Sequence, residues 1–322
     1  MTQTISRSGR RAGGTAAPSG SPPATGRKPW RRRDRAIASV AVLPLLLPFV
    51  LFALVPIGYV VYLSFTKYNG VLDPVWVGLS NYEILITDTV WWRSVRNTLI
   101  FGAGSVVFEI PLALGLALLL NRRVRFGGGF RAIFFIPNVV SIAVIGIVFY
   151  FLLRPVDGVI NGLLSWTGLV PEHYDWLGSG PSAMASLIAI GVWSGFGVNT
   201  VFFLVGLQTI PKEVVESATL DGATGWKHFW HITLPLLAPI LRVVIMLTII
   251  FTMRSFDIVK TLTDGGPAGQ TEVMFTYLFG YFFSLDRGAQ YGYASALAVV
   301  ASIIIAIISL IYMRFSRDGG SR

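Results

Sequence analysis

Apolar stretches long enough to cross a membrane recur along the chain, separated by short polar segments. They run over residues 36–65, 97–120, 132–153, 184–206, 236–258 and 291–313. About 20 mainly apolar residues suffice for a helix to cross a hydrocarbon core roughly 30 Å thick. The prolines inside the first two stretches are tolerable, because neighbouring helices can satisfy the backbone groups that proline frees. The pattern predicts an all-α polytopic membrane protein with six transmembrane helices.

Composition supports this fold class and excludes others. Of the 322 residues, 53% are hydrophobic and 13% are charged, against about 25% charged in soluble domains. The net charge of +10 is typical of nucleic-acid binders, but a soluble nucleic-acid-binding protein does not carry six such apolar stretches. No nucleic acid is therefore expected as a partner. The chain contains no Cys, which excludes disulfide scaffolds, thiolate chemistry and cysteine-ligated metal sites.

The basic residues flanking the apolar stretches predict the orientation. The two termini and the even-numbered connections carry 18 Lys and Arg, whereas the opposite loops carry six. Cytoplasmic segments hold the excess of basic residues in membrane proteins, so we expect both termini in the cytoplasm. The same side then holds the connection between the fourth and fifth stretches.

Three regions follow from this division of the chain. Residues 1–35 are rich in Ser, Gly, Pro and Arg and are predicted to form a disordered, basic cytoplasmic tail. Arg31–Arg33 fit an orientation anchor for the first span better than a twin-arginine export signal or a lipid-headgroup site. Residues 36–315 form the predicted six-span domain, which includes the loop at 209–235, and residues 316–322 form a C-terminal cytoplasmic tail.

The loop at 209–235 is predicted to carry two short amphipathic helices. Pro211 suits the first turn of the first helix, and Asp221-Gly222 is typical of a helix stop. A second helix would bring Trp226, Phe229 and Trp230 together at spacings of three and four. Such a pair could lie in the lipid headgroups, fold back as a structural plug, or dock into a groove on another protein.

Several motifs resemble those of one transporter family. Glu216-Ser217-Ala218, Gly222, Ile232 and Leu234-Pro235 resemble the EAA loop of bacterial ABC importer permeases, whose pattern is Glu-Ala-Ala, three residues, Gly, nine residues, Ile, any residue, Leu-Pro. Ser217 departs from the second Ala, a small-for-small change. The segment from Phe256-Asp257 to Gly265-Gly266-Pro267 resembles carbohydrate permeases of the maltose and glycerol-phosphate type. The resemblance covers residues 36–315.

The resemblance implies the permease subunit of an ATP-driven importer in a bacterial cell membrane. Such a subunit translocates a sugar or oligosaccharide by alternating access, after an extracytoplasmic binding protein delivers it. The implied partners are a second permease subunit, two ATP-binding subunits and membrane lipid. The chain shows no Walker A pattern, so we expect no enzyme activity and no cofactor of its own, with ATP bound by the partner subunits. The alternatives are an ion-coupled secondary transporter, with Glu109 and Asp257 as the ion relay, or an ABC permease for a non-sugar solute.

The resemblance also assigns a coupling role to the loop. Glu216 would pair with a basic group on the ATPase, Ala218 and Gly222 would permit close approach, and Leu234-Pro235 would connect the loop to the fifth span. An alternative is that Gly222 serves only as a helix cap. The full set of predicted coupling residues is Glu216, Ser217, Ala218, Asp221, Gly222, Ile232, Leu234 and Pro235.

Polar and aromatic residues inside the spans are the candidates for a substrate path. Charges at membrane depth are costly and usually face a cavity or one another, and aromatic rings offer flat faces to sugars. The alternative is that Arg254 and Asp257 neutralise each other on one helix face. His228 and His231, with no Cys nearby, are interpreted as polar contacts rather than metal ligands. The substrate-path candidates are Asp257, Phe256, Asn199, Trp193, Tyr150 and Glu109.

Overall fold

The computed structural model describes residues 42, 44, 46–121, 134, 136–168, 170–283 and 289–318. The predicted tail at 1–35 and the arginine-rich connection at 122–131 lie outside these residues. The chain divides into two compact units, Met1–Val55 and Pro56–Arg322, and each is considered by itself. In the first unit, the described residues from 46 to 55 are helical and nearly all exposed.

Helices dominate the described residues, with one short strand pair. In chain order the elements are η1 (Val50–Leu54), α2 (Val55–Leu63), β1 (Thr66–Lys67), β2 (Val75–Trp76), α3 (Ser80–Thr87), α4 (Thr89–Asn121), α6 (Ile142–Leu152), α7 (Val159–Trp166), α8 (Gly180–Gln208), α9 (Lys212–Leu220), α10 (Gly225–His228), η2 (Phe229–Thr233), α11 (Leu234–Met253), α12 (Asp257–Leu262), α13 (Met274–Phe283) and α14 (Tyr291–Asp318). The two strands pair antiparallel, with Thr66 opposite Trp76. They are an exception, two residues long each, to the predicted all-α fold.

Five helical segments of the described chain are long and apolar enough to cross a membrane: Leu46–Leu63, Thr89–Asn121, Gly180–Gln208, Gly225–Met253 and Tyr291–Ser316. These segments overlap the first, second, fourth, fifth and sixth predicted spans. They confirm an all-helical polytopic membrane protein.

The third predicted span is not one uninterrupted helix. Residues 136–139 are helical, Val140 and Ser141 break the helix, and α6 then runs for 11 residues. A helix of that length rises only about 16 Å, which is too short to cross a bilayer alone. Hydropathy did not reveal this break, because Asn138 and Ser141 are isolated polar residues in a stretch that is otherwise apolar.

The fifth predicted span is wrong at both ends. Its helix begins at Gly225, since α10, η2 and α11 follow one another without a break, and it ends at Met253 rather than at residue 258. Pro235 lies within this continuous helix, although proline lacks an N–H and its ring clashes with the preceding turn. The π-helical turn η2, immediately before it, widens the helix and accommodates the proline.

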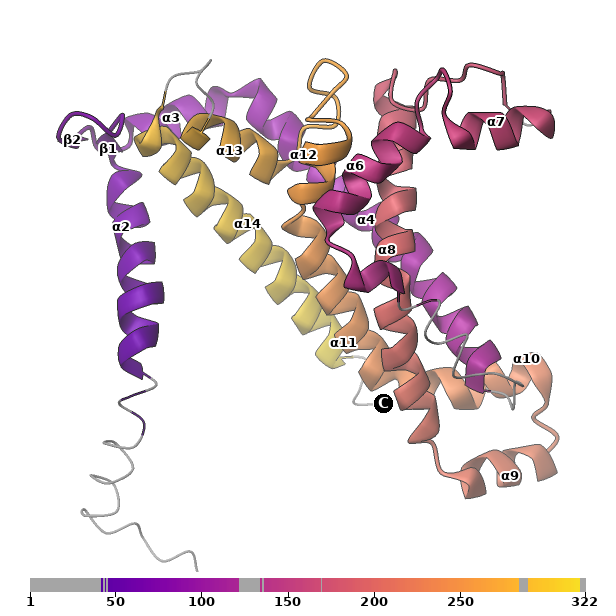
Figure 1. Ribbon diagram of the computed structural model, residues 1–322. Helices are drawn as coiled ribbons and strands as arrows, with labels where there is room; N and C mark the ends of the chain where they lie inside the picture. Colours follow the sequence, from indigo (N-terminus) through magenta and orange to yellow (C-terminus); the bar gives the residue numbers. More distant parts are fainter. Residues whose placement is uncertain are drawn as a thin grey trace, which may run out of the picture. The chain divides into compact units, whose positions relative to one another are not determined.

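Figure 1 shows α4, α8 and α11 running alongside one another, and the side chains confirm that they pack together. Ala113 and Ala117 of α4 and Phe203 of α8 are fully buried in the shared apolar cluster, which also contains Leu237 and Val244 of α11. Small residues let helix backbones approach closely in membranes, where the hydrophobic effect does not drive association. This three-helix core positions the polar groups described below.

Candidate functional site

Among the residues that the structure describes, those of the α9 helix are almost all exposed. It follows α8 and lies beyond the end of that helix (Figure 1). Of its nine residues, only Ala218 is buried. Val214 and Val215 are exposed, as is Leu220, at 89% exposed. Isolated helices shorter than about 12 residues are marginal in water, so α9 has the features of an element that packs against something outside this chain.

The predicted corner at Asp221-Gly222 is confirmed in detail. Gly222 has φ +81°, in the left-handed region. The N–H of Ala223 donates to the Ala218 carbonyl at 2.9 Å, and the N–H of Gly222 donates to the Thr219 carbonyl at 3.1 Å. These two bonds form a Schellman cap, which favours glycine at this position. A Cβ on Gly222 would meet no atom of this chain within 4 Å, so the space beside it is open.

The aromatic residues after this corner gather as the spacing predicted. The ring centroid of Trp226 lies 5.4 Å from that of Phe229 and 5.7 Å from that of Trp230. Trp226 is 73% exposed. Because the helix continues through η2 into α11, Ile232, Leu234 and Pro235 belong to one continuous helix with this aromatic cluster.

The two histidines of this segment make the expected polar contacts. The Nδ1 atom of His228 lies 3.1 Å from the Thr233 hydroxyl, and that of His231 lies 3.0 Å from the Lys227 carbonyl. Among the described residues, no group of three or more His, Cys, Asp and Glu could hold a metal ion.

Two of the substrate-path candidates meet inside the three-helix core. Asn199 of α8 donates from Nδ2 to Oε1 of Glu109 on α4 at 2.6 Å, and the same nitrogen lies 3.1 Å from the Thr248 hydroxyl on α11. Glu109 is 6% exposed and Asn199 is 7% exposed. Gly195 makes room for this contact, because a Cβ there would lie 2.6 Å from Glu109 Oε1. The polar cluster therefore joins three membrane-spanning helices.

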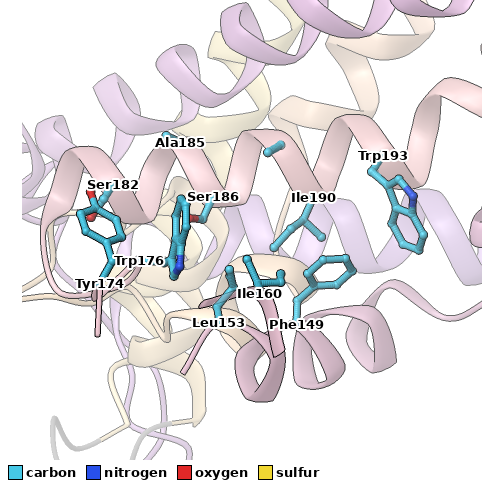
Figure 2. Close-up of a pocket in the computed structure, with 11 residues that line it drawn as sticks. Phe149, Leu153, Ile160, Tyr174, Trp176, Ser182, Ala185, Ser186, Ile190 and Trp193 are labelled. Atoms are coloured by element: carbon cyan, nitrogen blue, oxygen red, sulfur yellow. The ribbon is translucent and has the colours of Figure 1, made fainter. Parts of the chain in front are cut away.

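The remaining candidates lie apart from this polar cluster. Trp193 lines a cavity of about 500 Å³ between α6, α7 and α8, with its ring edge-on to Phe149 at 5.3 Å (Figure 2). Tyr150 is half-exposed and contacts the ring of Phe151. Phe256 packs on Phe279 of α13. The structure thus brings Glu109 and Asn199 together and leaves the aromatic candidates on separate surfaces.

The interpretation of Arg254 and Asp257 as a neutralising pair on one helix face is wrong. Arg254 caps the end of α11, whereas Asp257 begins the separate helix α12, so the two do not share a helix face. Both side chains are exposed, and they form no ion pair with each other. The backbone turn at 254–256 separates them, and spacing alone did not indicate that turn.

Comparison with known proteins identifies the family. The family described as "Binding-protein-dependent transport system inner membrane component" matches residues 109–318, more than half of the chain. The chain belongs to this family. As a member, it is an ABC transporter permease subunit, a multi-pass inner-membrane transport component and not an ATPase.

Two relatives align with the permease over nearly their whole length. The probable ABC transporter permease protein YurN of Bacillus subtilis is 33% identical over 290 residues, covering 89% of this chain and 98% of the relative. The trehalose/maltose transport system permease protein MalF of Thermococcus litoralis is 32% identical, covering 89% of this chain and 96% of the relative.

A solved structure has the same fold as the permease. It is the crystal structure of a bacterial ABC transporter that imports the acidic polysaccharide alginate, and one of its chains matches 89% of this chain with a TM-score of 0.75 at 24% identity. The match covers 96% of that chain. At this identity, the likeness concerns the fold.

A second polar junction in the permease was not anticipated from sequence. Asp88, the residue before α4, accepts hydrogen bonds from the hydroxyls of Tyr277 on α13 and Tyr293 on α14, both at 2.6 Å. Its other oxygen accepts the N–H groups of Val90 and Trp91, which caps α4. Burial by itself would raise the pKa of Asp88, but these hydrogen bonds outweigh burial and hold the pKa below its usual value. The partners are about 190 and 205 positions away, so no local pattern could have linked them.

Thr248 and Gly195 were also missed as members of the polar cluster around Glu109. Thr248 lies in a mainly apolar stretch. A threonine in such a helix commonly donates its hydroxyl to the backbone of its own helix, so no sequence pattern indicated a contact with another helix. A usable signal existed for Gly195, since small residues in a span often mark a close helix contact.

Proposed function

We propose that the chain is the membrane-spanning permease of an ATP-driven importer that takes up a sugar or oligosaccharide from an extracytoplasmic binding protein. The family match over residues 109–318 carries this proposal, because that family is named for transport that depends on a binding protein. The sugar specificity is supported by the trehalose/maltose permease, which aligns over 96% of its length. The partners are a second permease subunit and two ATP-binding subunits.

We further infer six crossings with both termini in the cytoplasm of a bacterial cell. The five long helices account for five crossings, and the broken segment that ends in α6 supplies the remaining one, between α4 and α8. The excess of basic residues on the side of the termini supports this orientation. Residues 36–315 form the permease domain, and the 1–35 tail anchors the first span.

We propose that α9 docks on an ATP-binding subunit. The plug alternative requires α9 to be buried in the chain, whereas only Ala218 is buried. The headgroup alternative requires a basic polar face, because inner leaflets are anionic. The segment from Lys212 to Asp221 instead carries one Lys and three acids, Glu213, Glu216 and Asp221. An acidic, exposed helix with a few apolar side chains suits a groove lined by basic groups on a protein.

Within this docking helix, the predicted residues take different parts. Glu216 and Ser217 are exposed and would contact the ATPase, as would the open space beside Gly222. Ala218 faces the permease itself and would position α9 rather than contact the partner. Ile232, Leu234 and Pro235 lie on the helix that continues into the membrane, so they would pass the movement to α11.

Neighbouring cysteines offer a matched test of docking. The chain has no native Cys, so Ser217→Cys and Ala218→Cys each introduce one thiol. A short bifunctional cross-linker should join Ser217→Cys to the ATP-binding subunit in the assembled transporter. Ala218→Cys should react poorly, because that position is buried. Absence of a cross-link at Ser217, or equal yields at both positions, would contradict the docking geometry.

The substrate path is proposed to pass two groups of the predicted residues. Trp193 lies at one end of the cavity, and Ser182 and Ser186 lie at the other end beside Trp176 (Figure 2). A lining with both ring faces and hydroxyls suits a sugar. Asn199 and Glu109 form the polar cluster in the core, so they would act on transport chiefly by holding α4 and α8 together. Asp257, Phe256 and Tyr150 remain proposed contacts near the ends of α12, α11 and α6.

Transport by the reconstituted complex decides between this function and its rivals. Proteoliposomes containing both permeases and the ATP-binding subunits should accumulate sugar only with ATP on the cytoplasmic side and with loaded binding protein outside. Uptake should survive a protonophore and a sodium ionophore. Uptake that needs no ATP and collapses with an ionophore would indicate an ion-coupled transporter. Transport of a panel of amino acids or peptides in place of sugars would favour a non-sugar permease.

A further inference from the structure

A groove between α11 and α14 carries two arginines beside apolar side chains. It has a volume of about 710 Å³ and is lined by Arg242, Val243 and Met246 of α11 and by Leu310, Tyr312, Met313, Arg314 and Ser316 of α14. Val243, Leu310 and Met313 are exposed. The Tyr312 hydroxyl donates to the Arg242 carbonyl at 2.8 Å, which holds the two helices together at this level.

The charge of this groove is not balanced by the described acids. Neither Arg242 nor Arg314 forms an ion pair with a described carboxylate. Arg242 is the only charged residue between Leu234 and Met253, and a lone charge inside a span is costly unless it meets a partner or reaches the membrane interface. Arg242 is not part of the polar cluster at Glu109, which involves Thr248 of α11 instead.

The direction of the two helices brings the arginines to similar depth. Side chains on a helix lean toward its N-terminus. In the proposed orientation, α11 starts at the cytoplasmic side. Arg242 lies about 12 Å along the helix from Leu234, the first residue of α11, so its side chain leans toward the cytoplasmic headgroups. The last turns of α14 end at that same side, so the side chain of Arg314 leans away from the cytoplasm, toward the centre of the bilayer. The two guanidinium groups therefore approach one level from opposite directions.

We propose that this groove binds an anionic phospholipid of the cytoplasmic leaflet. The two arginines would hold the phosphate, since guanidinium groups bind phosphate oxygens in pairs. In the proposed orientation Tyr312 would lie near the membrane interface, where aromatic residues are enriched. Val243, Met246, Leu310 and Met313 would contact an acyl chain. Basic pockets between transmembrane helices on the cytoplasmic side have the chemistry to bind anionic headgroups. The site depends on the proposed orientation but not on the transported solute.

Native mass spectrometry of the purified transporter tests this site. After exchange into mixed phosphatidylglycerol and phosphatidylcholine, the wild type should retain phosphatidylglycerol in preference. Arg242→Gln and Arg314→Gln should each lower that retention about fivefold, and the double variant about 25-fold. Arg242→Lys with Arg314→Lys keeps the charges but loses the paired guanidinium donors, so its retention should lie between those of the wild type and the double glutamine variant. Arg254→Gln removes an exposed arginine at the opposite end of α11, outside the groove, and should change nothing.

Three results would overturn the proposal. The first is equal retention of the two lipids by the wild type, and the second is unchanged retention in the double glutamine variant. The third is displacement of the lipid by inorganic phosphate alone, which would indicate a site for free anions. If the double variant does not yield an intact complex, the two single variants decide, with unchanged retention in both counting against the site. Sugar uptake in proteoliposomes is measured separately, so loss of the lipid site and loss of the proposed transport function are distinguishable.

Discussion

Replacing Asn199 with alanine should weaken the packing of three membrane helices at once. The variant removes the donor to Glu109 at 2.6 Å and the contact with Thr248 at 3.1 Å. Interhelical hydrogen bonds in membrane proteins contribute about 0.6 kcal/mol on average and about 1.7 at most, and a buried acceptor left without its donor costs about 1–3 kcal/mol. Because both side chains are more than nine-tenths buried, we expect a loss of about 2 kcal/mol of stability.

Unfolding in mixed detergent micelles measures this loss, with the fluorescence of the nine tryptophans as the signal. Thr248→Val keeps the Asn199–Glu109 bond and should cost less, about 0.6 kcal/mol. A double-mutant cycle then isolates the pair. In a Glu109→Leu background, Asn199→Ala should cost at least about 1 kcal/mol less than in the wild type.

Additive effects of Asn199→Ala and Glu109→Leu, within about 0.5 kcal/mol, would refute the reasoning, because residues that share a hydrogen bond must couple. Sugar uptake by Asn199→Ala should fall, while cross-linking of Ser217→Cys to the ATP-binding subunit should persist. Loss of both would mean that the variant disrupts the whole permease rather than the junction between α4 and α8.

Three further substitutions test other features. Hydrogen bonds lower the pKa of Asp88, so the stability that its charge contributes should be present at neutral pH and lost as the pH falls through the lowered pKa. Asp88→Asn can still cap α4, and the free energy of unfolding of this variant should depend less on acid pH than that of the wild type. Gly222→Val has open space but an unfavourable φ of +81°, so it should cost about 1–2 kcal/mol and lower permease-stimulated ATP hydrolysis. Gly195→Ala would place a Cβ 2.6 Å from Glu109 Oε1 and should cost about 1–3 kcal/mol. Its control, Gly115→Ala in α4, meets nothing within 4 Å and should leave stability unchanged or slightly higher. An equal cost at both glycines would contradict the close contact at Gly195.

Local patterns predicted the parts of this fold that depend on local physics. Long charge-poor runs indicated the membrane helices, Asp221-Gly222 indicated the left-handed corner, and the spacing of Trp226, Phe229 and Trp230 indicated their cluster. The runs depend on consecutive residues of one span, and the corner and the aromatic cluster depend on residues within five positions of one another, where local helix geometry determines which groups meet.

Features that depend on distant or backbone-specific interactions could not be predicted in this way. The first two turns of α4 contain Arg93 and Arg96, so hydropathy placed its beginning eight residues late. The ending of α11 at Met253 depends on a backbone turn within a stretch that includes no Gly or Pro. Asp88 meets its tyrosines only once α13 and α14 have packed, and a linear sequence carries no signal of that meeting.

The helical segment from Gly225 to Met253 joins the exposed aromatic cluster to the membrane without an intervening loop. It is not a straight rod, because it contains the π-helical turn η2 and Pro239, and helices bend at such features. Figure 1 shows the bend between α10 and α11. Leu237 and Val244, which pack against α4 and α8, hold the part of the segment beyond the bend. A loop would absorb a movement of the ATPase by changing its backbone angles, whereas this bent helix would carry the movement directly to the packed core of the permease.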